Sequence, residues 1–244
     1  MFDATEYGRK FAEQYDSLYP PGPDVTAAVE SLAALAPGGT ILELGVGTGR
    51  LALALAERDV SVTGLDISAD MLERLDQKSD GRVTSVEADM TDFDLGTTFD
   101  VVVMFADSLY ALPNQTLQKA AVARAVAHLK DDGVLVVDTT WPASIPDVPQ
   151  GSPVSMNAVS DTRLMVTASF TRKTDQMMLY AHTIIGPDGL EKINEPFRYV
   201  WPPELDLMAE LAGAELVVRH SGWAEQPLGE SPARVISRYR KTRP

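Results

Sequence analysis

Residues 41–50 read ILELGVGTGR, a short apolar run that contains an acid, Glu43, and is followed by glycines at positions 45, 47 and 49. The run from 40 to 44 suits a buried strand, and the leucines at 51, 53 and 55 suit the start of a helix. Between the two, glycine lets the backbone turn sharply and approach a ligand without a Cβ clash. The stretch therefore predicts a strand, a loop for a nucleotide-containing cofactor, and a helix.

The spacing of the glycines distinguishes between cofactors. A dinucleotide loop, G-x-G-x-x-G, would need its third glycine where Arg50 stands, and Gly49 comes one residue early. An acid two residues before the loop would also oppose the pyrophosphate that a dinucleotide loop holds at a helix N-terminus. Glu43 instead suits a ligand that carries an ammonium group and no phosphate.

Together with four later segments, this stretch resembles the class I S-adenosylmethionine-dependent methyltransferases, whose first motif is an acid followed by G-x-G-x-G. The later segments, which match the second to fifth strands of that family in order, are 60–66, 83–90, 99–105 and 129–138. The resemblance implies an α/β fold: a seven-stranded, mostly parallel, Rossmann-like sheet with helices on both faces. It further implies an N-terminal helical cover, an antiparallel β insert after strand five, and S-adenosylmethionine as the cofactor.

The resemblance assigns cofactor-binding roles to residues near the ends of these strands. Asp66 ends the second strand, where an acid accepts hydrogen bonds from ribose hydroxyls. Asp89 is expected to meet the adenine amine, and Ser68 offers an N-cap to the next helix. The complete set of expected cofactor-binding residues is Glu43, Gly45, Val46, Gly47, Gly49, Asp66, Ile67, Met71, Asp89, Met90 and Phe105.

The composition favours a single-domain enzyme. The chain has 244 residues, is 45% hydrophobic, and has no cysteine, which excludes disulfides and thiolate catalysis. No apolar run approaches the roughly 18 residues that span a bilayer, and the first ten residues lack a signal-peptide core. We therefore expect a cytoplasmic enzyme without membrane partners. The net charge of −14 opposes nucleic acid, so we expect a small-molecule or peptide substrate and a monomer or homodimer.

Pattern changes divide the single domain into four parts. Residues 1–39 are the helical cover, and residues 40–141 alternate strand and helix as the cofactor-binding core. Residues 142–202 are the antiparallel insert, in which segments 163–171 and 176–185 alternate as a hairpin and 197–201 suggests a further strand. Residues 203–244 supply a helix at 204–212 and strands six and seven, at 215–220 and 233–239.

Candidate acceptor residues come from three regions. Residues 12–16, AEQYD, are similar to an A-x-x-Y-D segment of small-molecule methyltransferases in which a tyrosine lies close to the sulfonium. This similarity implies that Tyr15 and Tyr19 position the acceptor. Asp107, after strand four, and His182, in the insert, are the first candidates for a base. Asp107 serves equally well as a loop cap, and His182 could face the core.

The chemistry of methyl transfer favours an amine acceptor. Positioning supplies most of the acceleration, and an amine needs only to lose one proton, whereas a hydroxyl or carbon nucleophile usually needs a dedicated base or metal. The three histidines are scattered and no acidic pair has ligand spacing, so no metal is expected. The chain is also similar to amino-sugar N-methyltransferases and to α-N-methyltransferases of linaridin peptides. The alternatives are an O-methyltransferase and a non-methylating enzyme on the same fold.

Overall fold

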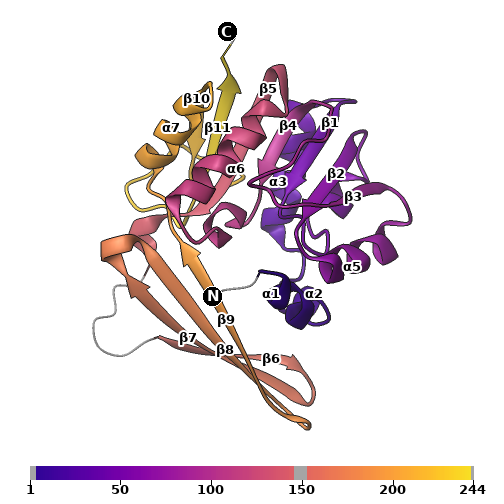
Figure 1. Ribbon diagram of the computed structural model, residues 1–244, viewed down its shortest axis with the longest axis vertical. Coiled ribbons are helices and arrows are strands. Elements are labelled where there is room, and N and C mark those ends of the chain that lie inside the picture. Colours follow the sequence, from indigo (N-terminus) through magenta and orange to yellow (C-terminus); the bar gives the residue numbers. More distant parts are fainter. Residues whose placement is uncertain (1–3, 146–152, 243–244) are drawn as a thin grey trace.

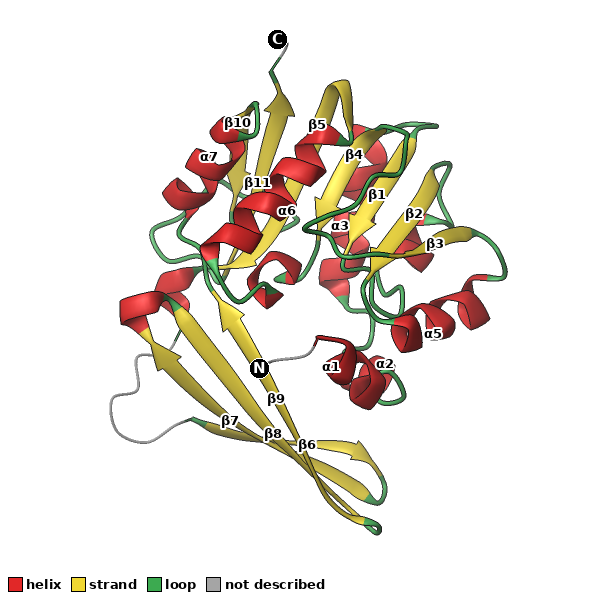
Figure 2. Cartoon of the chain, in the orientation of Figure 1, coloured by secondary structure: helices red, strands yellow, loops and turns green. Residues whose placement is uncertain are grey.

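The computed structural model describes residues 4–145 and 153–242, which form two sheets (Figures 1 and 2). The large sheet has seven strands in the order β10-β11-β5-β4-β1-β2-β3, and β11 alone among them runs against its neighbours. Its strands are β1 (Thr40–Leu44), β2 (Ser61–Asp66), β3 (Val83–Glu87), β4 (Phe99–Met104), β5 (Leu129–Thr140), β10 (Ala214–His220) and β11 (Arg234–Lys241). The expected fold class is confirmed.

Helices cover both faces of this sheet. On one face lie α3 (Pro23–Leu35), α4 (Ala52–Leu55) and α5 (Ala69–Ser79), and on the other α6 (Gln115–Ala127) and α7 (Pro202–Leu211). Because side chains alternate along a strand, Ile41 packs into the α3 layer, whereas Leu42 and Leu44 pack into the α6 layer. The two hydrophobic cores that result fix the sheet between its helices.

The parallel strands end at one edge of the sheet, and the remaining elements gather there (Figure 1). They are the helices α1 (Ala4–Phe11) and α2 (Tyr15–Leu18) and a second sheet of β6 (Val154–Ser160), β7 (Arg163–Arg172), β8 (Met177–Gly186) and β9 (Gly189–Arg198). All neighbouring strands of this four-stranded sheet are antiparallel, as the expected insert requires. Short 3-10 turns are η1 (Ser108–Ala111), η2 (Pro142–Ser144) and η3 (Lys173–Asp175).

A third hydrophobic cluster holds α1 between α5 and the insert. Phe11 of α1 packs with Met71 of α5 and with Met165, Ile184 and Ile193 of the four-stranded sheet. The N-terminal helices therefore form a layer between the cofactor half of the large sheet and the insert, which is the arrangement expected of a cover.

The boundaries differ from expectation in three places. The strand expected at 197–201 is wrong: β9 ends at Arg198, and Tyr199 and Val200 are buried in the core just before α7 begins at Pro202. The edge strand β6 was not predicted, although Val154, Met156 and Ala158 alternate with polar residues, and its side chains are mostly exposed. Helix α3 lies within the expected cover but packs in the helix layer of the large sheet.

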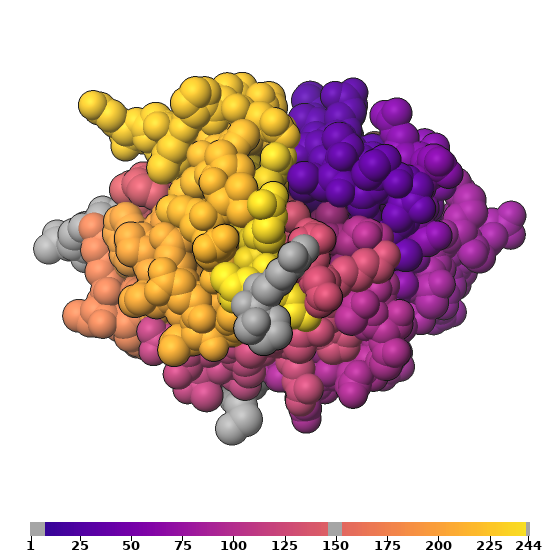
Figure 3. All heavy atoms as spheres, turned by 90° about the horizontal axis from the view of Figure 1, so that it is seen from above, coloured from indigo at the N-terminus to yellow at the C-terminus, as the bar shows by residue number. Residues whose placement is uncertain are grey.

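Both halves of the chain contribute to the face of the molecule opposite the cover. Seen from above, the C-terminal elements, in orange to yellow, lie beside the indigo and purple N-terminal half (Figure 3). Residues 1–3 of the expected cover and 146–152 of the expected insert lie outside the described residues.

Candidate active site

The glycine loop lies directly after β1. Gly45 and Gly47 have φ angles of +76° and +55°, which residues with a side chain rarely adopt. A Cβ on Gly45 would lie 2.9 Å from Ser108 Oγ, whereas nothing lies within 4 Å of one on Gly47. The N–H groups of Gly45 and Val46 both donate to the Leu65 carbonyl at the end of β2. The loop is therefore pinned to β2, with Gly47 facing open space.

The rest of the loop is held by packing. A Cβ on Gly49 would lie 2.4 Å from Leu75 Cδ1 of α5, and the φ angle of Gly49 is +89°. Val46 is buried against Gly64 of β2, where an added Cβ would lie 2.6 Å from Val46 Cγ2. Val46 and Gly49 thus shape the loop through contacts with the core and leave Gly47 as its exposed backbone.

Asp66 ends β2 beside this loop. Its Oδ2 accepts a 2.8 Å hydrogen bond from the Gly47 N–H, and its Oδ1 accepts one of 3.0 Å from the Ser68 N–H. Burial raises the pKa of the Asp66 carboxyl, against the lowering effect of these backbone donors. The carboxylate is held rigidly next to Gly47, with lone pairs left for hydroxyl donors.

Glu43 is the most unusual group in the site. It is 2% exposed, and its Oε2 has no hydrogen-bond partner in the described part of the chain. Burial raises the pKa of Glu43 to about 8, although the positive charge of Arg50 lowers it. A buried carboxylate requires a charged or hydrogen-bonding partner, and the ammonium of a bound ligand would supply one.

The remaining expected cofactor residues differ in their exposure. Ile67 and Asp89 are exposed at the ends of β2 and β3, and Asp89 Oδ1 accepts 2.8 Å hydrogen bonds from the Thr91 N–H and hydroxyl. Met71 and Phe105 are buried, and each packs within a hydrophobic cluster. Half-buried Met90 lies near Gly45, because a Cβ there would be 3.3 Å from Met90 Cε.

Helix α2 is fastened over the loop by one carboxylate. Asp16 accepts a hydrogen bond from the Thr48 hydroxyl at 2.5 Å and an ion-paired one from Lys78 of α5 at 2.7 Å. Tyr15 and Tyr19 lie beside this latch, with ring centroids 5.0 Å apart. Tyr15 is adjacent in sequence to Asp16, which bonds Thr48 of the glycine loop, and burial raises the pKa of Tyr15 to about 12. The Asp16 contacts close the cover onto that loop.

A cavity of about 560 Å³ lies between α2 and the insert. Its lining includes Tyr19 from the cover and Thr167, Tyr180 and His182 from the face of the four-stranded sheet toward the cover. This volume is within the range of small-molecule sites. The cavity is the candidate acceptor pocket, and it brings together two residues that the sequence singled out, Tyr19 and His182.

The two candidate bases are already engaged. Asp107 accepts hydrogen bonds from the Thr140 N–H at 2.6 Å and from Arg234 Nη1 at 3.0 Å, which ties the end of β4 to β5 and β11. Buried His182 contacts Thr167 Oγ1 through Nδ1 at 2.8 Å and Glu195 Oε2 through Nε2 at 3.3 Å. Asp107 and His182 therefore each take part in a polar network within the protein.

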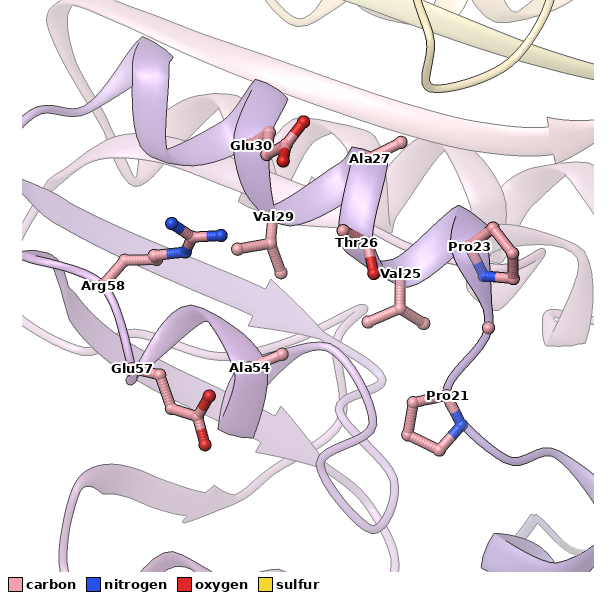
Figure 4. A pocket seen from close by; sticks show the side chains of 11 residues that line it. Pro21, Pro23, Val25, Thr26, Ala27, Val29, Glu30, Ala54, Glu57 and Arg58 are labelled. Carbon is pink, nitrogen blue, oxygen red and sulfur yellow. The ribbon is translucent and has the colours of Figure 1, made fainter.

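A larger cavity, of about 780 Å³, lies between α3 and α4 (Figure 4). Its wall includes Pro23 and Val29 from α3, Ala54 from α4, and Glu57 and Arg58 from the turn after α4. None of the expected site residues lines it. We therefore place the chemistry at the glycine loop and the cover.

Comparisons with known proteins agree with this geometry. A family model described as a methyltransferase domain matches residues 41–133. The cypemycin N-terminal methyltransferase of Streptomyces sp is 31% identical over 232 residues, 93% of this chain and 94% of that protein. The dTDP-3-amino-3,6-dideoxy-alpha-D-glucopyranose N,N-dimethyltransferase of Streptomyces fradiae is 34% identical over 143 residues, 56% of each. The CcbJ methyltransferase structure from Streptomyces caelestis has a TM-score of 0.89 at 32% identity, covering 99% of this chain and 100% of that one.

The chain belongs to the S-adenosylmethionine-dependent methyltransferases. The residues present fit this cofactor. The unpartnered Oε2 of Glu43 suits its ammonium group, and the open space at Gly47 lets the cofactor approach the backbone of the loop. Asp66 suits its ribose hydroxyls. No phosphate site is needed, in agreement with the acid before the loop.

Sequence reasoning missed three residues that the structure brings to the site. Gly8 of α1 packs on Ser68, Thr48 holds Asp16, and Glu195 contacts His182. Gly8 had a signal, because a glycine within a helical segment often marks close packing. Thr48 and Glu195 had none, since their partners are distant in the sequence.

Proposed function

We propose that this chain transfers the methyl group of S-adenosylmethionine to an amine nitrogen of a small natural product or of a peptide N-terminus. The observation that carries the proposal is the engagement of both candidate bases, Asp107 with Arg234 and His182 with Thr167 and Glu195. The printed functions of two relatives, N-terminal methylation of a peptide and N,N-dimethylation of an amino sugar, support it.

The protein's part in this chemistry is binding and orientation. When bound, S-adenosylmethionine supplies an electrophilic methyl carbon on a sulfonium. Glu43, Gly47 and Asp66 hold the cofactor, and the Asp16 latch closes α2 over it. Tyr15, in the helix fastened over the cofactor loop, and Tyr19, which lines the acceptor cavity, then position the amine. A carboxylate or solvent accepts the one proton that the amine must lose.

We also propose a cytoplasmic enzyme that works as a monomer or homodimer and does not act on nucleic acid, which the net charge of −14 opposes. Within residues 4–145 and 153–242, no helix is long and apolar enough to cross a membrane.

The test is a methylation assay with free amines and their N-acetylated counterparts. The panel contains an amino sugar and a short peptide with a free N-terminus, and tandem mass spectrometry locates the added methyl. We expect a methyl on nitrogen in the free amines and none in the acetylated controls. A methyl on oxygen or carbon would establish a different acceptor and overturn the proposal.

Variants of the same enzyme test the absence of a dedicated base. Tyr19→Phe, Asp107→Asn and His182→Gln should each lower turnover by at most about a hundredfold, because positioning carries the rate. A fall of about ten-thousandfold in any one of them would identify a base that an amine acceptor does not require.

A further inference from the structure

Glu195 of β9 is a shielded carboxylate next to the acceptor cavity. Its side chain is 14% exposed, and its Oε2 lies 3.3 Å from His182 Nε2. His182 is held in turn by Thr167, whose hydroxyl oxygen lies 2.8 Å from Nδ1. Because a neutral imidazole has one donor and one acceptor nitrogen, this chain suits a Thr167 hydroxyl that donates to Nδ1 and an Nε2–H that donates to Glu195. Glu195 is thereby held in orientation through Oε2.

Aromatic side chains line the cavity beside this carboxylate. Tyr19, Tyr180 and His182 line the cavity, and Tyr180 packs edge-on to Phe197 with centroids 5.5 Å apart. Burial raises the pKa of Tyr19, and the Glu195 charge is the next largest cause; burial, then Asp107 and Glu195, raise the pKa of Tyr180. Glu195 thus lies within electrostatic reach of two cavity walls.

The strand pairing places Glu195 on the cavity face of the insert. Glu195 is the cross-strand neighbour of Tyr180, and its carboxylate contacts His182; both of these residues line the acceptor cavity. A carboxylate next to an aromatic-lined cavity suits an organic ammonium, since both a negative charge and ring faces attract a cation.

We propose that Glu195 is the residue that recognises the acceptor, binding it as an alkylammonium ion in the cavity between α2 and the insert. His182 is a positioning residue: it holds Glu195 through Nε2 and is itself held by Thr167. This inference rests on the proposed function and adds the substrate class, which is a cationic amine small enough for the cavity. Neutral acceptors of the same shape are rejected, because they bring no positive charge to this shielded carboxylate.

The test is a binding experiment without turnover. The enzyme is saturated with S-adenosylhomocysteine and titrated at pH 7 with 2-phenylethylammonium chloride or with its neutral isostere, 2-phenylethanol, and saturation-transfer NMR gives both affinities. We expect the parent to bind the ammonium at least about tenfold more tightly than the alcohol, as a charge-assisted contact requires. Glu195→Gln should reduce that ratio to about one, with S-adenosylhomocysteine affinity unchanged as evidence of folding.

Two further variants control the experiment. Glu191→Gln makes the same change in charge on the same strand and the same face of the sheet, and it should keep the ammonium preference. His182→Gln should lower the ammonium-to-alcohol ratio to an intermediate value, a readout that loss of packing alone would not move. A parent that binds both probes alike, a Glu195→Gln variant that keeps the preference, or a Glu191→Gln variant that loses it equally would overturn the inference.

The outcomes separate this inference from the proposed function. If ammonium preference depends on Glu195 but mass spectrometry finds the methyl on oxygen, the ammonium site stands and amine methylation fails. If amines are methylated and Glu195→Gln leaves both the preference and the acceptor KM unchanged, amine methylation stands and the assignment of Glu195 fails.

Discussion

Glu43 is a buried acid whose negative charge suits a bound cation. Without the cation, the charged form of Glu43 destabilises the folded protein. Its folded pKa of about 8 lies above the ordinary value of 4.5, because burial disfavours the charged form. Between these values the folded protein holds a proton that the unfolded chain has released. The free energy of unfolding therefore falls as the pH rises through this range, and the loss is complete above the folded pKa.

The first prediction is that Glu43→Gln stabilises the protein while weakening cofactor binding. At pH 8.5, we expect the free energy of unfolding to rise by about 1 to 3 kcal/mol, the cost of an unsatisfied buried polar group, and the gain to shrink near pH 5. S-adenosylmethionine affinity should fall at least about tenfold, because the ammonium loses its partner. Urea unfolding and calorimetry measure the two effects. Exposed Glu30→Gln is the control, and a Glu43→Gln protein less stable than the parent would refute the account.

The second prediction concerns Asp66. Removing its carboxylate leaves two ribose hydroxyls without acceptors in a partly buried site, at a cost of roughly 1 to 3 kcal/mol. Calorimetry on Asp66→Ala should therefore show at least about tenfold weaker binding of S-adenosylmethionine. Asp70→Ala, in the exposed first turn of α5, should bind like the parent. Unchanged affinity in Asp66→Ala, or a parent that prefers NAD, would contradict the assignment.

At the scale of elements, the site depends on how closely α1 packs on α5. A Cβ on Gly8 would lie 1.9 Å from Ser68 Oγ and 2.4 Å from Ser68 Cβ. Ser68 is the N-cap of α5, where its hydroxyl accepts from the Met71 N–H, and its own N–H binds Asp66. The helix of the cover thus rests on the turn that orients the ribose carboxylate.

The third prediction is that Gly8→Ala displaces α1 and disturbs this turn. We expect about tenfold weaker S-adenosylmethionine binding and faster proteolysis near residues 4–19, because the short distance to Ser68 Cβ leaves no room for the added methyl. Gly229→Ala, where a Cβ meets open space and φ is ordinary, is the matched control. A Gly8→Ala protein with parental affinity and protease resistance would show that α1 does not support the site.

At the scale of the whole molecule, the chain joins a cofactor-binding sheet to an antiparallel insert through a thin cover. Contacts from α1 and α2 reach both bodies: Phe11 packs with His182 of β8 at 5.4 Å between ring centroids, and Asp16 binds Thr48 and Lys78. The acceptor cavity is lined by residues of the cover and of the insert.

The fourth prediction is full activity in the presence of a chelator. The sequence has no cysteine, and in the described residues no group of three His, Asp or Glu side chains is placed to hold a metal ion. We expect equal turnover with and without EDTA in the methylation assay. Turnover that EDTA abolishes and magnesium or calcium restores would reverse this expectation and favour a metal-dependent O-methyltransferase.

The local sequence pattern was sufficient to predict the cofactor-binding half of the molecule. Glu43, Gly45, Gly47 and Asp66 are all carried by two strands that pair in register and by the loop that follows the first strand. Parallel strands bring their carboxyl ends to one edge, so residues at those ends meet whatever the rest of the chain does. The order of the strands followed from the same alternation of strand and helix.

Only the tertiary structure decided which polar side chains pair with one another. The pairs Asp16 with Thr48, His182 with Glu195, and Asp107 with Arg234 are 32, 13 and 127 positions apart. Periodicity reports which face of an element is buried, and it carries no information about the polar partner that packs there. The sequence by itself thus determined the fold class and the cofactor. The pairing of the candidate bases, and the place of Glu195, came from contacts between strands: His182 meets Glu195 between β8 and β9 of the insert, and Asp107 meets Arg234 across the large sheet.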